Sequence, residues 1–522
     1  MKGQLTVSDL KFEYPEYAEF EADQVLRGLS FCCRSGEITV IIGGAESGKS
    51  TLALILAALV PSHTGGQLSG RVVLDGLDIL GSPAAEIIEN CGIIFQDPEK
   101  QTVTTDCFSE AAFALESLGL AEEEIISRVE GSFETLGIGH LLESGTVETS
   151  GGEKKKLAIA GQLCVNPDLW IMDETFEELD SPSRVKLLDS LKDNRRSVLI
   201  FTSKYYDIFE KADAFYHLRD GRLSEREELP FSPGFTLGLR EDGLIPDFVT
   251  TSRRPAASDS LPDLISVRDL AFSYSTGREG IAGDHWAFDL NIDEFSLTDG
   301  EIVSIVGRNG CGKSTFGKLL CGLLIQDRGE IRAAGFGVPA AEEPAAMTAQ
   351  SGPPASTDFL NSFCAYMFQN PDYQIFLPTV YQELSWGLVE AGIPHSEIKE
   401  RVELAIENFN LPGASTPPAM MSYSARKRLQ VAVYYLLKRP VFILDEADTG
   451  LSYHDFKGLI EQLRSISRGI IIITHNLELA AEVSDRVLGM SGGRITEDLR
   501  EFSTDSLKTW LSASAGSGRT GR

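Results

Sequence analysis

The stretch Gly307 to Thr315 reads Gly-Arg-Asn-Gly-Cys-Gly-Lys-Ser-Thr and fits the phosphate-binding pattern G-x-x-x-x-G-K-[ST]. An apolar, strand-like run from Ile302 to Val306 precedes it, and an apolar helical run follows it. In such a loop the glycines let backbone N–H groups surround a phosphate, the lysine reaches the β- and γ-phosphates, and the serine hydroxyl binds Mg²⁺. The nucleotide-binding residues predicted here are Gly307, Asn309, Gly310, Cys311, Gly312, Lys313, Ser314 and Thr315.

The same pattern occurs a second time, as Gly-Gly-Ala-Glu-Ser-Gly-Lys-Ser-Thr from Gly43 to Thr51, after the apolar run Ile38 to Ile42. Average residue usage gives one chance match in roughly one chain per fifty of this length. Two matches between a strand and a helix therefore indicate two nucleotide sites. The residues predicted to bind nucleotide in this copy are Gly43, Gly48, Lys49, Ser50 and Thr51.

The two loops belong to an internal duplication. Matching positions are separated by nearly constant offsets along the chain. Lys313 follows Lys49 by 264 residues, and Gln369 follows Gln96 by 273. The offset is 272 for three further pairs, which are Ser150 and Ser422, Asp173 and Asp445, and Thr202 and Thr474. The extra residues fall in 335–362, which is rich in Ala, Pro, Ser and Thr and predicts a flexible insertion. We therefore expect one nucleotide-binding domain in 1–229, a linker in 230–262, a second domain in 263–498 and a tail in 499–522 with a disordered end.

Strand-like and helical runs alternate in each copy, which predicts an α/β fold with a mainly parallel sheet. In the first copy we expect strands around Leu5 to Phe12, Gly36 to Ile42, Arg71 to Leu74, Gly92 to Phe95, Leu169 to Met172 and Ser197 to Phe201. The expected helices are Ser50 to Leu59, a block over Ser109 to Leu142, Lys154 to Cys164 and, in the second copy, Pro394 to Phe409.

Composition excludes several classes of protein. The net charge of -30 disfavours a groove that neutralises nucleic acid, so we expect no nucleic-acid partner. No apolar stretch approaches the length of a membrane span, and the N-terminus lacks the apolar region of a signal peptide, so we expect an intracellular chain. The eight cysteines contain no C-x-x-C pair, and most are expected to be buried thiols. Cys311 lies at a helix N-terminus, which favours its thiolate, and its alkylation is expected to block ATP hydrolysis.

Further motifs follow each loop in the same order. The strand-like runs ending at Met172 and Leu444 are followed by Asp173-Glu174 and Asp445-Glu446, and Thr149-Ser150-Gly151-Gly152-Glu153 opens a helix. Alone, such paired carboxylates could be a solvated strand end. Taken together, nearly the whole chain resembles the ATP-binding-cassette ATPases in two copies. The resemblance implies two tandem P-loop domains, each with a parallel core, an antiparallel β subdomain and a helical subdomain.

The resemblance also implies roles. Its catalytic residues would be Glu446, Glu174, His475 and Gln369, with Glu446 and Glu174 polarising the attacking water. Its Mg²⁺ ligands would be Ser314, Gln369 and Asp445 in one copy and Ser50, Gln96 and Asp173 in the other. The signature residues Ser150, Gly151, Gly152 and Glu153, together with Asp180, would complete an ATP site. Tyr14 and Tyr274 stand where the family stacks an aromatic ring on adenine, although an ordinary strand tyrosine remains an alternative.

The stretch Phe368 to Phe376 resembles the Q-loop of the energy-coupling-factor importers, which take up vitamins and transition metals. Phe95 to Gln101 agrees with it, as does Val380 to Leu388. This resemblance implies two integral membrane partners, a transmembrane coupling protein and a substrate-binding protein, and a peripheral position on the cytoplasmic side of the membrane.

The copies differ at the positions that matter most for ATP hydrolysis. In the first copy Glu46 replaces a loop glycine, and Ser203 stands where the second copy keeps His475. In the second copy Tyr423 and Ser424 replace signature glycines, and Ser452 replaces Asp180. The family pairs its modules head to tail, so all five changes would fall in the composite site built on Lys49. We therefore expect hydrolysis mainly on the Lys313 side.

Two other functions remain open at this level. A soluble twin-cassette ATPase of translation or DNA repair usually carries a charged linker arm, zinc-binding cysteines or an iron–sulfur segment, and none is visible. A nucleotide-gated regulator without transport would show damage in both sites.

Overall fold

The computed structural model describes residues 3–15, 24–62, 64–82, 86–87, 90–149, 151–177, 179, 181–245, 263–274, 289–334 and 356–514. The chain divides into two compact units. The first comprises Met1–Asp247 with Gly450–His454, and the second comprises Phe248–Thr449 with Asp455–Arg522.

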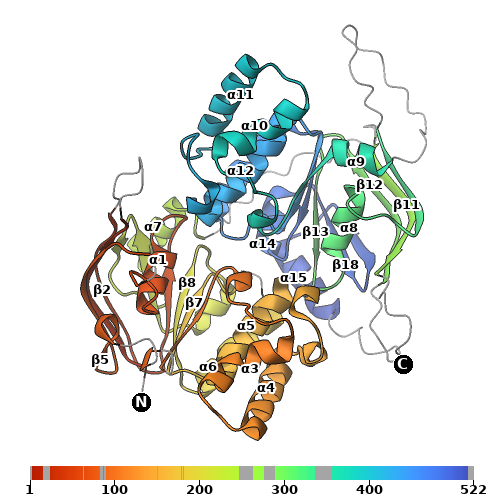
Figure 1. Ribbon diagram of the computed structural model, residues 1–522. Helices are drawn as coiled ribbons and strands as arrows, with labels where there is room; N and C mark the ends of the chain where they lie inside the picture. The colour runs from red at the N-terminus through yellow and green to blue at the C-terminus, as the bar shows by residue number, and fades with distance from the viewer. Residues whose placement is uncertain are drawn as a thin grey trace. The chain divides into compact units, whose positions relative to one another are not determined.

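The first unit contains two sheets (Figure 1). The antiparallel one has the order β2-β1-β4-β5, and the six-stranded one has the order β10-β9-β3-β8-β7-β6, parallel except for β10. The strands are β1 Leu5–Glu13, β2 Gln24–Cys33, β3 Ile38–Ile42, β4 Gln67–Leu74, β5 Leu77–Asp78, β6 Cys91–Ile94, β7 Leu169–Asp173, β8 Ser197–Thr202, β9 Ala214–Arg219 and β10 Arg222–Leu223. The main helices are α1 Lys49–Leu56, α3 Cys107–Ser117, α4 Glu122–Leu136, α5 Gly151–Val165, α6 Ser181–Asp193 and α7 Pro233–Glu241.

The parallel strands are apolar without alternation because both faces of their sheet are buried. On one face, α1 packs between the two sheets, where Leu52 and Ile55 meet Ile41 of β3 (Figure 1). On the other face, Val40 packs with side chains of α3, α4 and α5. The predicted helical block of Ser109 to Leu142 is thus two helices, α3 and α4, joined by a short turn.

The second unit repeats this plan. Its antiparallel sheet has the order β12-β11-β14, and its six-stranded sheet has the order β15-β16-β17-β13-β18-β19, parallel except for β19. The strands are β11 Asp263–Ser273, β12 Asp289–Thr298, β13 Ile302–Gly307, β14 Arg328–Ala333, β15 Cys364–Met367, β16 Val441–Asp445, β17 Gly469–Ile473, β18 Arg486–Ser491 and β19 Arg494–Leu499. The helices are α8 Lys313–Leu320, α9 Thr357–Phe363, α10 Val380–Glu390, α11 His395–Asn408, α12 Tyr423–Leu436, α13 Tyr453–Ile466, α14 Leu477–Val483 and α15 Thr504–Ser514. The α/β fold with tandem P-loop domains is confirmed.

Helices form in three segments that the sequence analysis assigned to the linker, the insertion and the tail. The expected linker begins too early, because α7 buries Phe235 and Leu239 in the core of the first unit. The end of the expected insertion forms α9, while 335–355 lies outside the described residues. The expected tail forms α15, whose Leu507 is buried and whose Trp510 packs on the same cluster. In each case a few apolar side chains at helical spacing outweigh the polar composition around them.

The helices that the structure describes include none that is both long and apolar enough to cross a bilayer. None of the eight cysteines, all of which are described, forms a disulfide, and seven are buried, as expected from the sequence.

Candidate functional site

The phosphate loop of the second unit connects β13 to α8. Gly307 cannot carry a side chain, because a Cβ would lie 2.4 Å from the carbonyl oxygen of Met490. Gly312 caps α8 with φ 104°, which is a left-handed conformation that favours glycine. The buried Lys313 ammonium donates to the carbonyl oxygens of Gly307, at 3.0 Å, and Arg308, at 3.1 Å. The loop thus folds around its own lysine at the N-terminus of a helix.

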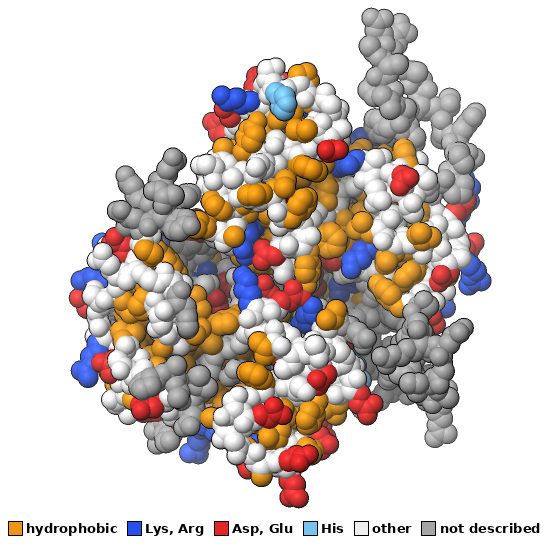
Figure 2. Space-filling model, in the orientation of Figure 1, with side chains coloured by type: hydrophobic (Ala, Val, Ile, Leu, Met, Phe, Trp, Pro, Cys, Tyr) orange, Lys and Arg blue, Asp and Glu red, His pale blue; other side chains and the backbone are white. Residues whose placement is uncertain are grey.

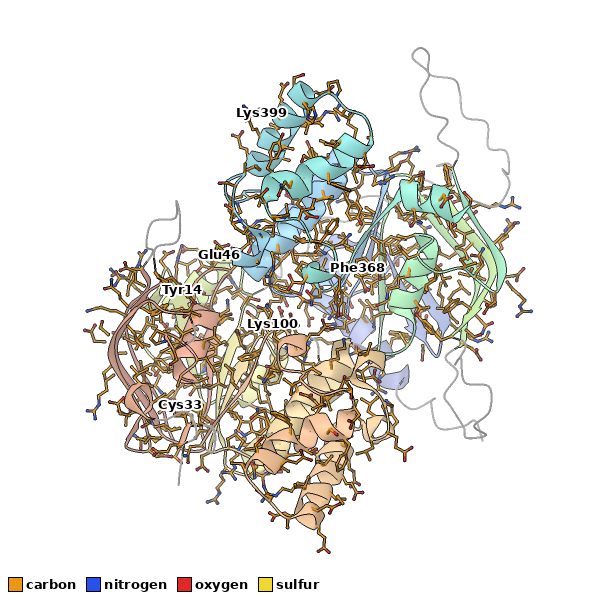
Figure 3. The ribbon with its side chains drawn as sticks, viewed as in Figure 1. Tyr14, Cys33, Glu46, Lys100, Phe368 and Lys399 are labelled. Carbon is orange, nitrogen blue, oxygen red and sulfur yellow. The ribbon has the colours of Figure 1, made fainter. Side chains whose placement is uncertain are left out.

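The first unit has the same loop with one difference. The Lys49 ammonium donates to the carbonyl oxygens of Gly43 and Gly44, both at 2.8 Å. Glu46 has φ 61°, and its counterpart Gly310 has φ 75°. The loop therefore imposes a left-handed conformation at this position, and the exposed Glu46 (labelled in Figure 3) adopts it at a cost that glycine avoids.

Both predicted aromatic residues lie beside their loops. The Tyr14 hydroxyl is 3.2 Å from Thr51 Oγ1, and the Tyr274 hydroxyl is 3.4 Å from Thr315 Oγ1. Tyr14 is labelled in Figure 3. The duplication thus preserves a contact between each tyrosine and the start of the loop helix.

In the second unit Asp445 ends β16 and faces the loop serine. The Ser314 hydroxyl donates to Asp445 Oδ1 at 3.0 Å, and the Tyr366 hydroxyl donates to Asp445 Oδ2 at 2.5 Å. Burial raises the pKa of Asp445, and these two hydrogen bonds oppose the rise. A serine hydroxyl beside one carboxylate suits Mg²⁺, which usually takes one or two carboxylates and completes its coordination with water and phosphate oxygens.

In the first unit Asp173 holds the matching position. Burial raises its pKa, while hydrogen bonding from Ser50 opposes the rise. Its Oδ1 atom is buried without a hydrogen-bond partner among the described residues, so it could accept a cation or a bound water. Both pairs therefore fit Mg²⁺, whose positive charge would stabilise phosphate oxygens when the ion is bound. Across the part of the chain that is described, no group of three or more His, Cys, Asp or Glu side chains could hold a metal ion.

The carboxylate that follows each aspartate differs between the units. Glu446 Oε1 lies 3.4 Å from His475 Nδ1. Burial raises the pKa of Glu446, but His475 and Lys313 lower it more, so the net shift is downward. Glu446 therefore carries a negative charge at neutral pH.

Glu174 lies in a different network. Its Oε1 is 3.5 Å from the Lys49 ammonium, and its Oε2 accepts from the Ser203 backbone N–H at 3.0 Å. Ser203 Oγ lies 3.3 Å from the buried Glu177, which pairs with the buried Lys204 at 3.3 Å. Burial and the negative charge of Glu177 raise the pKa of Glu174 to about 8. Glu174 is thus mostly protonated at pH 7, whereas Glu446 is ionised.

The Q-loops follow β6 and β15. The buried Lys155 of α5 donates to the carbonyl oxygen of Gln96 at 2.6 Å, and Tyr423 of α12 donates to that of Gln369 at 3.0 Å. Gly151 and Gly152 begin α5, and Glu153 contacts His140 at 3.1 Å. Ser150 and Asp180 lie outside the described residues. In the second unit Ser422 caps α12 by accepting from the Ala425 N–H, and Ser424 is buried. Ser452 is also buried and belongs to the segment Gly450–His454, which groups with the first unit.

Several residues of the site gave no signal in the sequence analysis. Lys155, Lys427, Tyr366, Glu177 and Lys204 are buried polar side chains whose partners lie far away in sequence. A further pair, Gln101 and Gln374, closes each Q-loop by donating to the carbonyl oxygens of Ile93, at 2.8 Å, and Tyr366, at 3.1 Å. Their offset of 273, equal to that of Gln96 and Gln369, could have revealed them.

Cys311 is buried, with 7% of its side chain exposed. Cys32 is of intermediate exposure, so we expect a thiol reagent to react with Cys32 more readily than with Cys311.

Comparison with known proteins gives consistent matches. The ABC transporter family model matches residues 26–177 and 290–449, together more than half of the chain. A protein of Methanosarcina acetivorans, provisionally named an ABC transporter ATP-binding protein, is 29% identical over 95% of this chain and 85% of its own length. A protein of Treponema denticola with the same provisional name is 27% identical over 95% of this chain and 97% of its own length.

A solved structure resembles this chain over both units. The archaeal ribosome recycling factor aABCE1, in complex with the ribosomal stalk protein aP1, matches with a TM-score of 0.59. The match covers 96% of this chain and 92% of that one at 18% identity, so the likeness is one of fold.

Proposed function

This chain belongs to the ABC transporter family, and we propose that it is the ATPase subunit of a membrane importer, bound to the cytoplasmic face through membrane partners. The family hydrolyses ATP with Mg²⁺, and the two phosphate loops, each closed around its own lysine at a helix N-terminus, support this proposal. The resemblance of Phe368 to Phe376 to the Q-loop of energy-coupling-factor importers supports uptake of a vitamin or transition metal.

A duplicated pair of exposed hydrophobic side chains carries this proposal. Val103 and Phe113 in the first unit are 65% and 49% exposed, and Phe376 and Trp386 in the second are 72% and 51% exposed. Phe376 minus Val103 and Trp386 minus Phe113 are each 273, the offset between the Q-loop glutamines. Large exposed hydrophobic residues at matching positions beside both Q-loops favour a protein-binding role.

The second unit extends this surface. Tyr373 and Val389 are 59% and 45% exposed, whereas Lys100 and Glu116 occupy their counterparts. Figure 2 shows hydrophobic side chains gathered over the region of α10 and α12. Because helices of the membrane partner would have to dock on the ATPase, we propose that these residues receive a cytoplasmic helix of that partner.

Hydrolysis is proposed to occur mainly on the Lys313 side. In the family the units pair head to tail, so each ATP lies between one phosphate loop and the other unit's signature. Glu446 is ionised at neutral pH and can polarise the attacking water, whereas the pKa of Glu174 is raised to about 8 by burial. A protonated carboxyl cannot accept a proton from water. The Lys49 side would therefore hold ATP and hydrolyse it slowly.

A second function has one observation in its favour. The likeness to aABCE1 extends over both units, as expected of a twin-cassette ATPase that acts at the ribosome. At 18% identity the likeness concerns the fold, and the net charge of -30 disfavours a partner built largely of RNA. We therefore place this alternative second.

The experiment is affinity purification of the tagged full-length chain from detergent-solubilised native membranes. We expect a polytopic membrane protein to co-purify with the wild type and to be lost from Phe376→Glu and Trp386→Glu. Ile325→Glu is the matched control, because Ile325 is also 72% exposed but lies in the loop between α8 and β14. Association with ribosomes, or equal recovery of the membrane protein with all three variants, would contradict the proposal.

A further inference from the structure

Two contacts connect the start of the signature helix, which is α5 in the first unit and α12 in the second, to the Q-loop. The first contact is an ion pair in both units, whereas the second contact differs between them. Lys154 pairs with Glu99 in the first unit, and Arg426 lies 3.3 Å from Asp372 in the second. Arg426 and Lys154 are matching positions, as are Asp372 and Glu99. An ion pair thus links helix and loop in both units.

The second contact differs. In the first unit the fully buried Lys155 donates to the carbonyl oxygens of Phe95, at 2.8 Å, and Gln96, at 2.6 Å. In the second unit the matching Lys427 is also fully buried, but it donates to the carbonyl oxygen of Glu446 at 3.0 Å. The Q-loop carbonyl of Gln369 accepts from the Tyr423 hydroxyl instead, at 3.0 Å.

Tyr423 therefore does in the second unit what Lys155 does in the first. A buried ammonium must be matched by hydrogen-bond acceptors, and in the first unit Q-loop carbonyls accept from two of the three N–H donors of Lys155. With the tyrosine on the Q-loop, Lys427 can reach the turn after β16. Its ammonium lies 5.4 Å from the centre of the Tyr423 ring, so the two side chains are also neighbours.

The turn that Lys427 reaches is strained. Glu446 has φ 46°, a left-handed conformation that costs a non-glycine residue free energy. The hydrogen bond from Lys427 fixes the carbonyl of this residue and so restricts the direction of its side chain. One helix end thus holds both Gln369 and Glu446.

We propose that Tyr423 and Lys427 are positioning residues for ATP hydrolysis on the Lys313 side, with Tyr423 holding the Q-loop so that Lys427 holds Glu446. In this view the tyrosine at a signature glycine position serves its own unit, besides weakening the signature for the opposite site. The inference rests on the proposed hydrolytic role of the Lys313 side.

The test is Tyr423→Phe in the full-length chain, with Glu174→Gln as the background so that turnover reports the Lys313 side. Loss of one hydrogen bond should lower kcat about threefold to tenfold with an unchanged KM for ATP. Amide hydrogen exchange in residues 368–376 should become faster, while residues 95–101 of the first unit stay as they are. Tyr435→Phe is the control, because Tyr435 lies on the same helix and packs against Phe409.

An unchanged kcat, or a loss that Tyr435→Phe reproduces, would overturn the inference. Tyr423→Gly distinguishes the positioning role of Tyr423 in its own unit from a role confined to the signature of the opposite site. The positioning role predicts lower total turnover, whereas relief of a damaged signature predicts higher turnover and would also overturn the inference. The hydrogen-exchange measurement keeps this test distinct from that of the proposed hydrolytic role of the Lys313 side, which fails if Glu446→Gln retains full turnover.

Discussion

The Tyr366 hydroxyl donates a hydrogen bond to Asp445 Oδ2 at 2.5 Å and lies 3.4 Å from the carbonyl oxygen of Ser314. The first unit has Ile93 at the matching position, so its Asp173 lacks this donor. A tyrosine hydroxyl thus orients the proposed Mg²⁺-binding carboxylate in the second unit but not in the first. Burial raises the pKa of Asp445, and the hydrogen bond from Tyr366 opposes this rise.

Tyr366→Phe is expected to weaken Mg²⁺ binding on the Lys313 side about tenfold to a hundredfold, since a hydrogen bond to a charged group contributes roughly 1.5–3 kcal/mol. The measurement is a titration of Mg²⁺ against binding of a fluorescent ATP analogue. Ile93→Val, which removes one methylene at the matching position, is the control and should leave the titration unchanged. Equal Mg²⁺ affinity in Tyr366→Phe and the wild type would show that the hydrogen bond from Tyr366 to Asp445 does not contribute to Mg²⁺ binding.

Glu446→Gln is expected to reduce steady-state ATP turnover by at least a hundredfold, on the scale of losing one preorganised catalytic group, a few kcal/mol. Glu174→Gln should reduce it less than twofold, because Glu174 is mostly protonated at pH 7 and its amide replacement changes little. Both are measured as phosphate release at saturating ATP. Equal losses in the two variants would refute the proposed asymmetry.

The stability of the first unit should depend on pH through Glu174. Its pKa is about 8 in the folded chain against 4.5 for the ordinary group, so the stability it contributes is present below pH 4.5 and is lost as pH rises through 8. Glu174→Gln, which cannot ionise, should therefore gain stability over the wild type as pH rises from 5 to 9, by a few kcal/mol. The measurement is urea unfolding in EDTA without nucleotide.

Glu446→Gln is the contrasting control for this pH series. The pKa of Glu446 is lowered, so its contribution is present above its ordinary pKa and is lost only in acid. The difference between Glu446→Gln and the wild type should stay constant from pH 5 to pH 9. A constant difference in both variants would mean that Glu174 is ionised like Glu446, and an upward trend in both would mean that the pKa of Glu446 is raised like that of Glu174.

Glu46→Gly should stabilise the first unit by about 1 kcal/mol, because Glu46 holds φ 61° where Gly310 holds 75°. Ala45→Gly, at the neighbouring residue, should destabilise it by loss of backbone restriction. Calorimetry of the ligand-free chain gives both changes. If Glu46→Gly lowers the transition temperature, the loop does not strain this residue.

Helix α7 should stabilise the first unit through Leu239, which is fully buried, but not through Leu237, which is 57% exposed. Leu239→Ala is expected to cost about 2–5 kcal/mol of unfolding free energy, and Leu237→Ala less than about 0.5 kcal/mol. The two variants share a helix and a residue type, so unfolding by denaturant compares burial alone. Similarly small losses of unfolding free energy in both variants would mean that residues 233–245 belong to the linker and not to the first unit.

The sequence alone predicted the duplicated α/β fold, because the loops, the carboxylates and the buried strands are local patterns with fixed spacing. It also identified Glu46, Ser203 and Tyr423 as departures, since one copy can be compared with the other. These features depend on residues close together in the chain, so backbone conformation and apolar periodicity can be predicted directly from the local sequence.

The tertiary structure decided what those residues touch. The raised pKa of Glu174 depends on burial and on the neighbouring Glu177 carboxylate. The position of Lys427 depends on a tyrosine hydroxyl that donates to a carbonyl oxygen 54 residues away. Hydrogen bonds and charge interactions act over a few ångströms in space, whatever the separation along the chain. Two lysines at matching positions, Lys155 and Lys427, therefore look identical in sequence and acquire different partners only when the chain folds.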